Sequence, residues 1–415
     1  MQSCKHIKYS VQLFKENLQS ILECVNSEIA KIEVICNVST KANFSSLMVK
    51  LKGENELIYL VAKEYLHYWN HGIDCLILKA VLRECLLYEI CQECTDLAQL
   101  VPKCYHFSSI SYDEFCEAIE NHKNVQSWLP SKPPKPHNKE AGLVLFEDLR
   151  PENGWKTLKR QDCTDIYVTK LIIEKMATFH GIMFKWLESQ DEAKQEQLLK
   201  RLKYPIYKEN SMKLQWKNLR YLEDILKKSG KSNEFIDAFK YYRKHQIQHD
   251  FRLCLPKYSN FVTLVLGNTQ CEDILLNEQT SEIKFFNFEA LQFAHPGHDF
   301  WTFIYTTTNS EWRKNHLDEI LSLYHKTISQ YFGPSLYEDF KVEFNSKRAF
   351  GISWALYILP FILKDKNTKV NSLKQWKKLQ KWKKKQLKKL NNRGNEELKE
   401  VLLEIIEEAH QLRIF

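Results

Sequence analysis

The sequence predicts an α+β fold in which a small mixed N-terminal part precedes a large, mainly helical C-terminal part. Strand-like segments concentrate before residue 150, whereas amphipathic helical patterns dominate after it. A length of 415 residues exceeds what one small core requires and indicates two domains. We expect the first domain over 1–149 and the second over 150–415.

Helices and strands alternate in the N-terminal part. Helical periodicity runs over 9–30 and again over 73–94, where apolar residues recur every three or four positions. Four segments have the composition of strands: 42–51, 56–66, 100–107 and 143–149. Residues 108–142 form an insert, in which Ser111 and Glu114 match a capping box. The insert has four prolines in seven positions, which predicts an extended surface loop.

The C-terminal part is dominated by long amphipathic helices. Strong helical patterns cover 166–188, 350–363 and 395–412. Strands around Gly267 and Asn287 interrupt the helices, and we expect a loop over 266–275 and a strand over 283–291. His180 lies on an apolar helix face, which favours a hydrogen-bonded core histidine. Asp299 precedes an aromatic helix, and we expect it to cap that helix and to brace the loop at Gly267.

The positive charge of the chain is local. The net charge is +8, but the segment from Lys374 to Arg393 alone contains nine lysines, one arginine and no acid. The other 395 residues therefore carry about −2. This distribution argues against a nucleic-acid-binding surface. As a helix, the segment 374–393 presents either a solvated outer face or a docking face for an anionic membrane or an acidic partner.

The expected location is the cytoplasm. The first twenty residues lack the apolar core of a signal peptide. The longest apolar run, 350–363, is too short to span a bilayer and contains Pro360. Twelve cysteines in this context predict reduced thiols. Cys91 and Cys94 have zinc-ligand spacing, but no second pair follows, which favours core cysteines over zinc.

Five motifs in order resemble one family of proteins. They are "IYLVAKEYL", "ECLLYEI", "LVLFEDLRPENGW", "KMATFHGIMF" and "HPGHDFWTFIYTT". Together they resemble the ecdysteroid-kinase-like (CHK-kinase-like) family of the protein-kinase-like fold, which is related to choline and aminoglycoside kinases. The resemblance covers nearly the whole chain. It implies a bilobal fold, ATP and Mg²⁺ as cofactors, and phosphotransfer to the hydroxyl of a steroid or another small lipophilic alcohol.

The resemblance also nominates residues for nucleotide binding. It places Lys63 on the strand that carries the phosphate-pairing lysine and Glu84 on the helix that carries its partner; a surface salt bridge is the alternative. The other nominated positions are Asn43, Ser46, Glu147 and Leu149, the last two through backbone groups that would contact the adenine. Lys41 stands where the family has a glycine, and its side chain obstructs a close backbone approach to phosphate.

The catalytic positions depart from the family pattern. "LGNTQCEDI" replaces "HGDLWvNNi", so Leu266 stands for the histidine and Asn268 for the aspartate that accepts the proton. Asp273 and Asn287 stand for the metal-binding asparagine and aspartate. An amide oxygen is a weaker Mg²⁺ ligand than a carboxylate. Glu289, on the face of Asn287 if the strand is regular, is a candidate replacement ligand.

Three functions follow from these observations. The first is a pseudokinase, or a much-weakened kinase, that binds a ligand on a kinase scaffold. The second is an active kinase that uses Asp273 and Glu289 to hold metal. The third is an interaction protein that uses the proline-rich insert and the basic segment.

Overall fold

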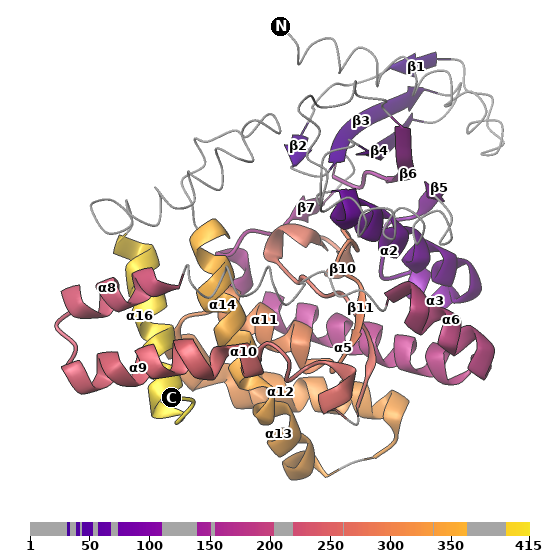
Figure 1. Cartoon of the computed structure of the whole chain (residues 1–415). Helices are drawn as coiled ribbons and strands as arrows, with labels where there is room; N and C mark the ends of the chain where they lie inside the picture. The colour runs from indigo at the N-terminus through magenta and orange to yellow at the C-terminus, as the bar shows by residue number, and fades with distance from the viewer. Residues whose placement is uncertain are drawn as a thin grey trace, which may run out of the picture. The chain divides into compact units, whose positions relative to one another are not determined.

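The described residues of the chain fall into two compact units (Figure 1). The computed structural model describes residues 31–33, 39–41, 44–52, 57–67, 74–109, 139–150, 154–202, 219–259, 261–334, 336–362 and 396–415. The first unit contains the described residues up to Gln92 and those from Pro102 to 150. The second unit contains Glu93–Val101 and the described residues from 154 onward.

An antiparallel sheet occupies the first unit. Its order is β1-β3-β4-β6-β5, with β2 paired to β3. The strands are β1 (Lys31–Glu33), β2 (Ser39–Lys41), β3 (Phe44–Lys52), β4 (Leu57–His67), β5 (Cys104–Ser109) and β6 (Lys139–Glu147). The strands predicted at 42–51 and 56–66 correspond to β3 and β4, which pair with each other. Pairing places Ser46 opposite Lys63 and Lys63 opposite Val144.

The helix of the first unit is α2 (Asp74–Glu93), as the periodicity over 73–94 predicts. Residues 80–90 of this helix are buried apart from the half-buried Glu89, and they include Arg83 and Glu84 at 2% and 0% exposure. A helix that buries charged residues must supply them with partners, because an unpaired buried charge is costly. Glu84 has such a partner on β4.

Several predicted features lie outside the described residues. These are the helix over 9–30, the turn at Gly53, residues 110–138 of the insert and the basic segment 374–393. At the ends of the predicted insert, β5 continues to Ser109 and β6 begins at Lys139. The strands therefore extend into the range 108–142 from both sides.

Helices make up most of the second unit. Its described helices are α3 (Thr95–Ala98), α5 (Ile166–Glu188), α6 (Glu192–Leu202), α8 (Arg220–Lys228), α9 (Asn233–His245), α10 (Ile247–Asp250), α11 (Gly297–Thr307), α12 (Ser310–Phe332), α13 (Tyr337–Ser346), α14 (Arg348–Ile362) and α16 (Glu396–Gln411). The helix predicted over 166–188 coincides with α5. Asp165 caps it by accepting hydrogen bonds from the Tyr167 and Val168 amides.

Short strands in the second unit form two small sheets. One has the order β10-β9-β7 and the other pairs β11 with β8. Their bounds are β7 (Trp155–Thr157), β8 (Thr263–Val265), β9 (Ile274–Asn277), β10 (Glu282–Phe285) and β11 (Gln292–Ala294). The prediction of one strand over 283–291 is wrong. Asn287 has a φ of 71°, in the left-handed region, so an extended strand does not pass through it.

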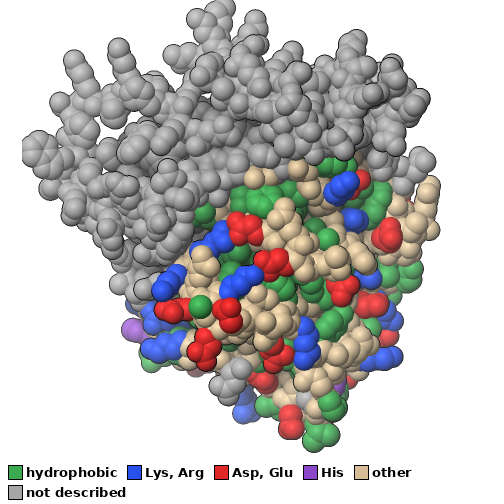
Figure 2. Space-filling view, turned by 90° about the vertical axis from the view of Figure 1, so that its right-hand side faces the viewer, with side chains coloured by type: hydrophobic (Ala, Val, Ile, Leu, Met, Phe, Trp, Pro, Cys, Tyr) green, Lys and Arg blue, Asp and Glu red, His purple; other side chains and the backbone are tan. Residues whose placement is uncertain are grey.

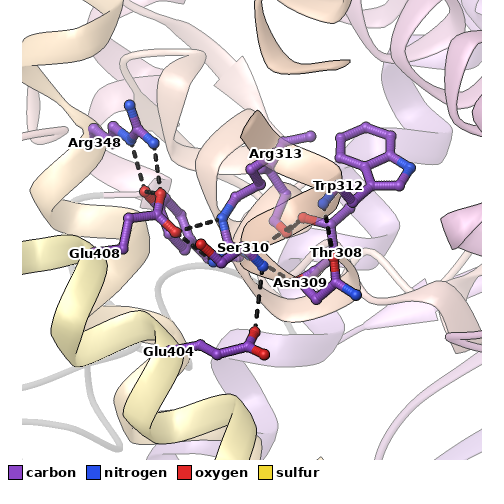
Figure 3. A network of polar contacts seen from close by, with 10 residues as sticks. Thr308, Asn309, Ser310, Trp312, Arg313, Arg348, Glu404 and Glu408 are labelled. Carbon is purple, nitrogen blue, oxygen red and sulfur yellow. Dashed lines mark hydrogen bonds and ion pairs between the residues drawn. The ribbon is translucent and has the colours of Figure 1, made fainter. Parts of the chain in front are cut away.

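The last helix, α16, packs on the second unit through an apolar stripe and a buried carboxylate. The sequence pattern places Leu398, Val401, Leu402, Ile405, Ile406 and Ala409 on one face; all are buried except Val401, which is half-buried. Figure 3 shows the polar network around Glu408. Arg313 on α12 and Arg348 on α14 donate to opposite oxygens of the Glu408 carboxylate, and Tyr305 on α11 also donates to it. One carboxylate therefore joins four helices.

The α+β prediction, with a small antiparallel sheet and a large helical part, is confirmed. Among the helices that the structure describes, none is both long enough and apolar enough for a membrane span. Figure 2 shows acidic and basic side chains interspersed with hydrophobic ones on one face of the described residues. This mixture agrees with the near-neutral charge that the sequence indicates outside 374–393.

Candidate active site

Lys63 on β4 and Glu84 on α2 form a buried ion pair. Lys63 Nζ donates to both Glu84 oxygens, at 2.8 and 3.0 Å. The two residues are 4% and 0% exposed, so the alternative of a surface salt bridge is wrong. Contact with both oxygens fixes the ammonium group on the strand. The predicted pairing is confirmed, and the role of the pair in nucleotide binding stays a prediction.

The strands beside Lys63 carry the other phosphate-side positions. Ser46 lies directly across from Lys63 in the β3–β4 register. Lys41 ends β2 and pairs with Phe44 at the beginning of β3. Asn43 lies outside the described residues. The structure therefore places Ser46 next to Lys63 in the sheet and leaves its contact with phosphate as a prediction.

The segment predicted to contact the adenine follows β6. The backbone amide of Glu147 donates to the Lys103 carbonyl at 2.9 Å, so this amide is used within the first unit. Asp148 is buried and pairs with Arg150, whose Nε and Nη2 donate at 2.7 and 2.9 Å. Leu149 is 5% exposed. The Asp148 side chain is thus engaged in a local ion pair.

Asp299 holds the backbone of the loop that follows β8. Its Oδ2 accepts from the Leu266 amide at 2.6 Å, and its Oδ1 accepts from the Gly267 amide at 2.9 Å. The predicted bracing is confirmed. The predicted capping is wrong, because α11 begins at Gly297 and Asp299 lies within its first turn, with Pro296 at the cap position.

A buried hydrogen-bonded chain surrounds Asp299. His180 Nε2 lies 3.0 Å from Oδ2, and its Nδ1 lies 2.7 Å from the Tyr324 hydroxyl. On the other side, His298 Nδ1 lies 3.1 Å from Oδ1, and the Gln292 amide donates to His298 Nε2. Because His298 Nε2 accepts, its proton is on Nδ1 and points to Asp299. His180 is a hydrogen-bonded core histidine, as predicted.

The electrostatics of this chain favour an ionised Asp299. Burial by itself raises the pKa of the carboxyl, but hydrogen bonds from His180 and His298 outweigh burial and hold the pKa below its usual range. The two loop amides add to this preference, since amide donors stabilise the charged form. The loop is therefore fastened to a permanent anion at neutral pH.

Gly267 has a φ of 81°, which lies in the left-handed region that favours glycine. A Cβ atom at this position would overlap the carbonyl oxygen of Ala290. The loop therefore needs glycine here for two separate reasons: its backbone conformation and the close approach of another segment.

Asn268 stands next in the loop, at the position of the catalytic base in the resemblance. Its Oδ1 accepts a hydrogen bond from Gln270 Nε2 at 2.8 Å. The side chain is half-buried. An amide can orient a hydroxyl group by hydrogen bonding, but it cannot take up the proton. The side chain at position 268 therefore offers a hydrogen bond but no proton acceptor.

Asp273 and Asn287, the two predicted metal positions, do lie together. Asn287 Nδ2 donates to Asp273 Oδ1 at 3.0 Å. The alternation that would place Glu289 on the face of Asn287 is absent, because the strand ends at Phe285. Among the described residues there is no group of three or more His, Cys, Asp or Glu able to hold a metal ion. One carboxylate facing an amide N–H does not fit the Mg²⁺ site that the resemblance implies.

Sequence reasoning missed Tyr324 and Gln292. Tyr324 lies 144 residues after His180, and nothing in the pattern of α12 distinguishes it from an ordinary core tyrosine. Gln292 is a polar residue on a buried strand, with 8% exposure. A buried amide must find a partner, so Gln292 carried a usable signal.

A family model for the ecdysteroid kinase-like family matches residues 26–333 of the chain. The chain belongs to the ecdysteroid kinase-like family. This match covers the strands of the first unit, the Lys63–Glu84 pair and the loop that Asp299 holds. It confirms the resemblance that the five motifs carry. No curated protein matches the chain.

Solved structures of phosphotransferases are similar to the ecdysteroid kinase-like chain. An ethanolamine kinase of Plasmodium vivax is 13% identical, with a TM-score of 0.41, over 81% of this chain and 78% of that one. A spectinomycin phosphotransferase in complex with ADP and spectinomycin is 13% identical, with a TM-score of 0.42, over 93% and 98%. An aminoglycoside-3'-phosphotransferase of type VIII is 10% identical, with a TM-score of 0.35, over 80% and 98%.

Proposed function

We propose that this chain binds a small ligand on a kinase-like scaffold and that its phosphotransfer activity is lost or strongly reduced. The observation that carries the proposal is Asn268. Its amide stands where the family pattern has the base, and it is hydrogen-bonded to Gln270 within the loop. Help from a general base contributes roughly 10²–10⁴-fold to rate. A loss of that size converts a working kinase into a binding protein or a very slow enzyme.

The proposed ligand is a hydroxyl-bearing steroid or another small lipophilic alcohol. This class follows from membership of the ecdysteroid kinase-like family. Weak binding of ATP is part of the proposal, because the buried Lys63–Glu84 pair retains the cation that would face a phosphate. A cytoplasmic location is also proposed, and fractionation of cells that express the chain tests it.

A slow kinase is the second candidate, and the same ion pair favours it. Burying the Lys63–Glu84 ion pair costs desolvation free energy. A protein that retains this pair at that cost is more readily explained if the lysine still binds phosphate. The interaction function rests on the insert and the basic segment, outside the described residues. Deleting 132–139 and testing partner capture would examine it.

Phosphotransfer is tested by ADP formation with the purified full chain, ATP, Mg²⁺ and a panel of hydroxysteroids. We expect no ADP formation above that of the Lys63→Met variant, which removes the phosphate-side cation. The triple variant Asn268→Asp, Asp273→Asn, Asn287→Asp restores the family residues at these three positions, and we expect its ADP formation to exceed that of Lys63→Met by at least tenfold. Ligand binding to the parent chain is read separately, from the shift in melting temperature with each steroid.

Turnover by the parent chain that disappears in Lys63→Met would contradict the proposal and favour the slow kinase. An absence of steroid binding in every member of the panel would contradict the ligand-binding part. If the triple variant remains inactive although the chain binds ATP, the loss extends beyond these three positions.

A further inference from the structure

The hydrogen bond between Asn287 and Asp273 has a direction that matters for metal binding. The Asn287 side-chain amide lies 3.0 Å from Asp273 Oδ1. The nitrogen of the amide, and not its oxygen, is the atom that faces Asp273 Oδ1. A cation held by both side chains would need both oxygens turned toward one point.

We propose that the Asn287 amide takes the place of a divalent cation on Asp273, so that the chain binds nucleotide as the metal-free anion. This inference rests on the proposed binding function and specifies how that binding occurs. With the amide oxygen turned inward and no cation present, two acceptors would repel each other. The observed N–H···O arrangement gives Asp273 Oδ1 a donor without metal.

The backbone fixes the two residues in this arrangement. The Phe286 amide donates to the Asp273 carbonyl at 3.1 Å, one residue before the side-chain contact. The Asp273 amide donates to the Gln270 carbonyl at 3.0 Å. Asp273 is 6% exposed, and Asn287 has a left-handed backbone that asparagine tolerates better than most residues. Backbone hydrogen bonds on both sides therefore hold Asp273 and Asn287 in contact.

Metal binding is tested with Mn²⁺ as the probe, on the full chain, by electron paramagnetic resonance of free Mn²⁺. The control is Asp273→Asn, which removes the carboxylate and keeps its shape. We expect the parent chain and this control to bind equal amounts of Mn²⁺ up to 1 mM. The Asn287→Asp variant should bind Mn²⁺ at least tenfold more tightly than either. Mn²⁺ binding by the parent that Asp273→Asn abolishes would overturn the proposal, as would no gain in Asn287→Asp.

A second measurement does not depend on metal uptake. Urea unfolding of the parent, Asp273→Asn, Asn287→Gly and the double variant gives a mutant cycle; glycine accommodates the left-handed backbone at 287. We expect the effect of the double variant on the unfolding equilibrium constant to differ by at least threefold from the product of the two single effects. Additive effects would mean that the amide does not hold the carboxylate, and the proposal would fail.

Nucleotide binding separates this inference from the proposed function. We expect ATP to bind the parent chain at least as tightly in EDTA as in Mg²⁺, because Mg²⁺ in solution complexes the metal-free anion. Affinity that falls tenfold or more in EDTA would overturn the metal-free mode, even if no phosphotransfer occurs. Conversely, the parent chain could form ADP and yet bind no Mn²⁺ through Asp273. That result would contradict the proposed loss of phosphotransfer and would agree with metal-free nucleotide binding.

Discussion

Both oxygens of Asp299 accept two hydrogen bonds each. Oδ2 accepts from Leu266 and His180, and Oδ1 accepts from Gly267 and His298. An ionised carboxylate can only accept hydrogen bonds, and the four N–H donors around Asp299 occupy both of its oxygens. The residue acts on the loop through its backbone, which makes it a positioning residue.

We predict that Asp299→Asn destabilises the chain by about 3 kcal/mol, because its amide nitrogen would face an N–H group in the buried site. Urea unfolding at pH 7 measures the loss. The matched control is Asp165→Asn at the exposed start of α5, where asparagine caps as well as aspartate, and we expect a change below about 0.5 kcal/mol. Equal losses in the two variants would refute the role of Asp299.

Residue contacts were predictable where a motif placed both partners. The Lys63–Glu84 pair and the bracing by Asp299 follow from the order of motifs, although their partners are 21 and 32 residues away. The helix-capping role of Asp299 was wrong because the helix begins two residues earlier. The Tyr324–His180 contact was not predictable, because packing between α5 and α12 alone brings the pair together.

The helix α16 is fastened to several elements by its carboxylates. Besides Glu408, Glu407 pairs with Lys231, and Glu404 accepts from the Ser310 amide at the start of α12. Burial raises the pKa of the Glu408 carboxyl, but the hydrogen bond and charge of Arg313 outweigh burial, so the pKa lies below its ordinary value. The carboxylate is therefore stabilised by folding.

The stabilisation by Glu408 should depend on pH in a defined direction. A depressed pKa means that the contribution is present above the unfolded pKa and is lost as pH falls through the folded pKa. We predict that Glu408→Gln costs about 3 kcal/mol at pH 7, since it leaves Arg313 buried without its anion. The difference from the parent should shrink below about pH 4. Thermal unfolding across pH 3–7 measures it.

The control for this prediction is Glu400→Gln, a substitution of an exposed carboxylate on the same helix. We expect it to change stability by less than about 0.5 kcal/mol at every pH. A loss for Glu408→Gln that stays constant between pH 3 and 7 would show that the charge of Glu408 is not what stabilises the helix.

Long helices and strands were predictable from the sequence, and very short ones were not. α5 has 23 residues with a strong apolar period, and its bounds match the prediction. β7 has only three residues, too few for any period, and its partner β9 lies far along the chain. The single strand expected over 283–291 is interrupted because the left-handed backbone at Asn287 has no signal in hydropathy.

At the scale of the whole molecule, charge is distributed unevenly. Ten positive charges lie in the twenty residues of 374–393, and the remainder is near neutral. We expect the segment to be a solvated face with no vesicle binding. Any binding to anionic vesicles should come from this segment and weaken with salt, as the Debye length falls from about 10 Å at 0.1 M to about 3 Å at 1 M. Vesicle flotation at both salt concentrations measures it.

The variant for this test changes Lys383, Lys384 and Lys385 to glutamine. Its matched control changes three exposed lysines of the described part to glutamine: Lys227, Lys314 and Lys326. Both variants lose three charges, so a difference between them isolates the segment. Vesicle binding that survives the first change and disappears with the second would contradict the assignment.

Gly267 has a consequence for how related chains evolve. A Cβ at this position would overlap the Ala290 carbonyl oxygen whether or not a base follows at 268. Selection for a folded loop therefore preserves glycine, and Asp299 with it, after selection for catalysis has ceased. Position 268 is then free to drift. Among homologues, a low substitution rate at 267 beside a high rate at 268 would mark the lineages that abandoned phosphotransfer.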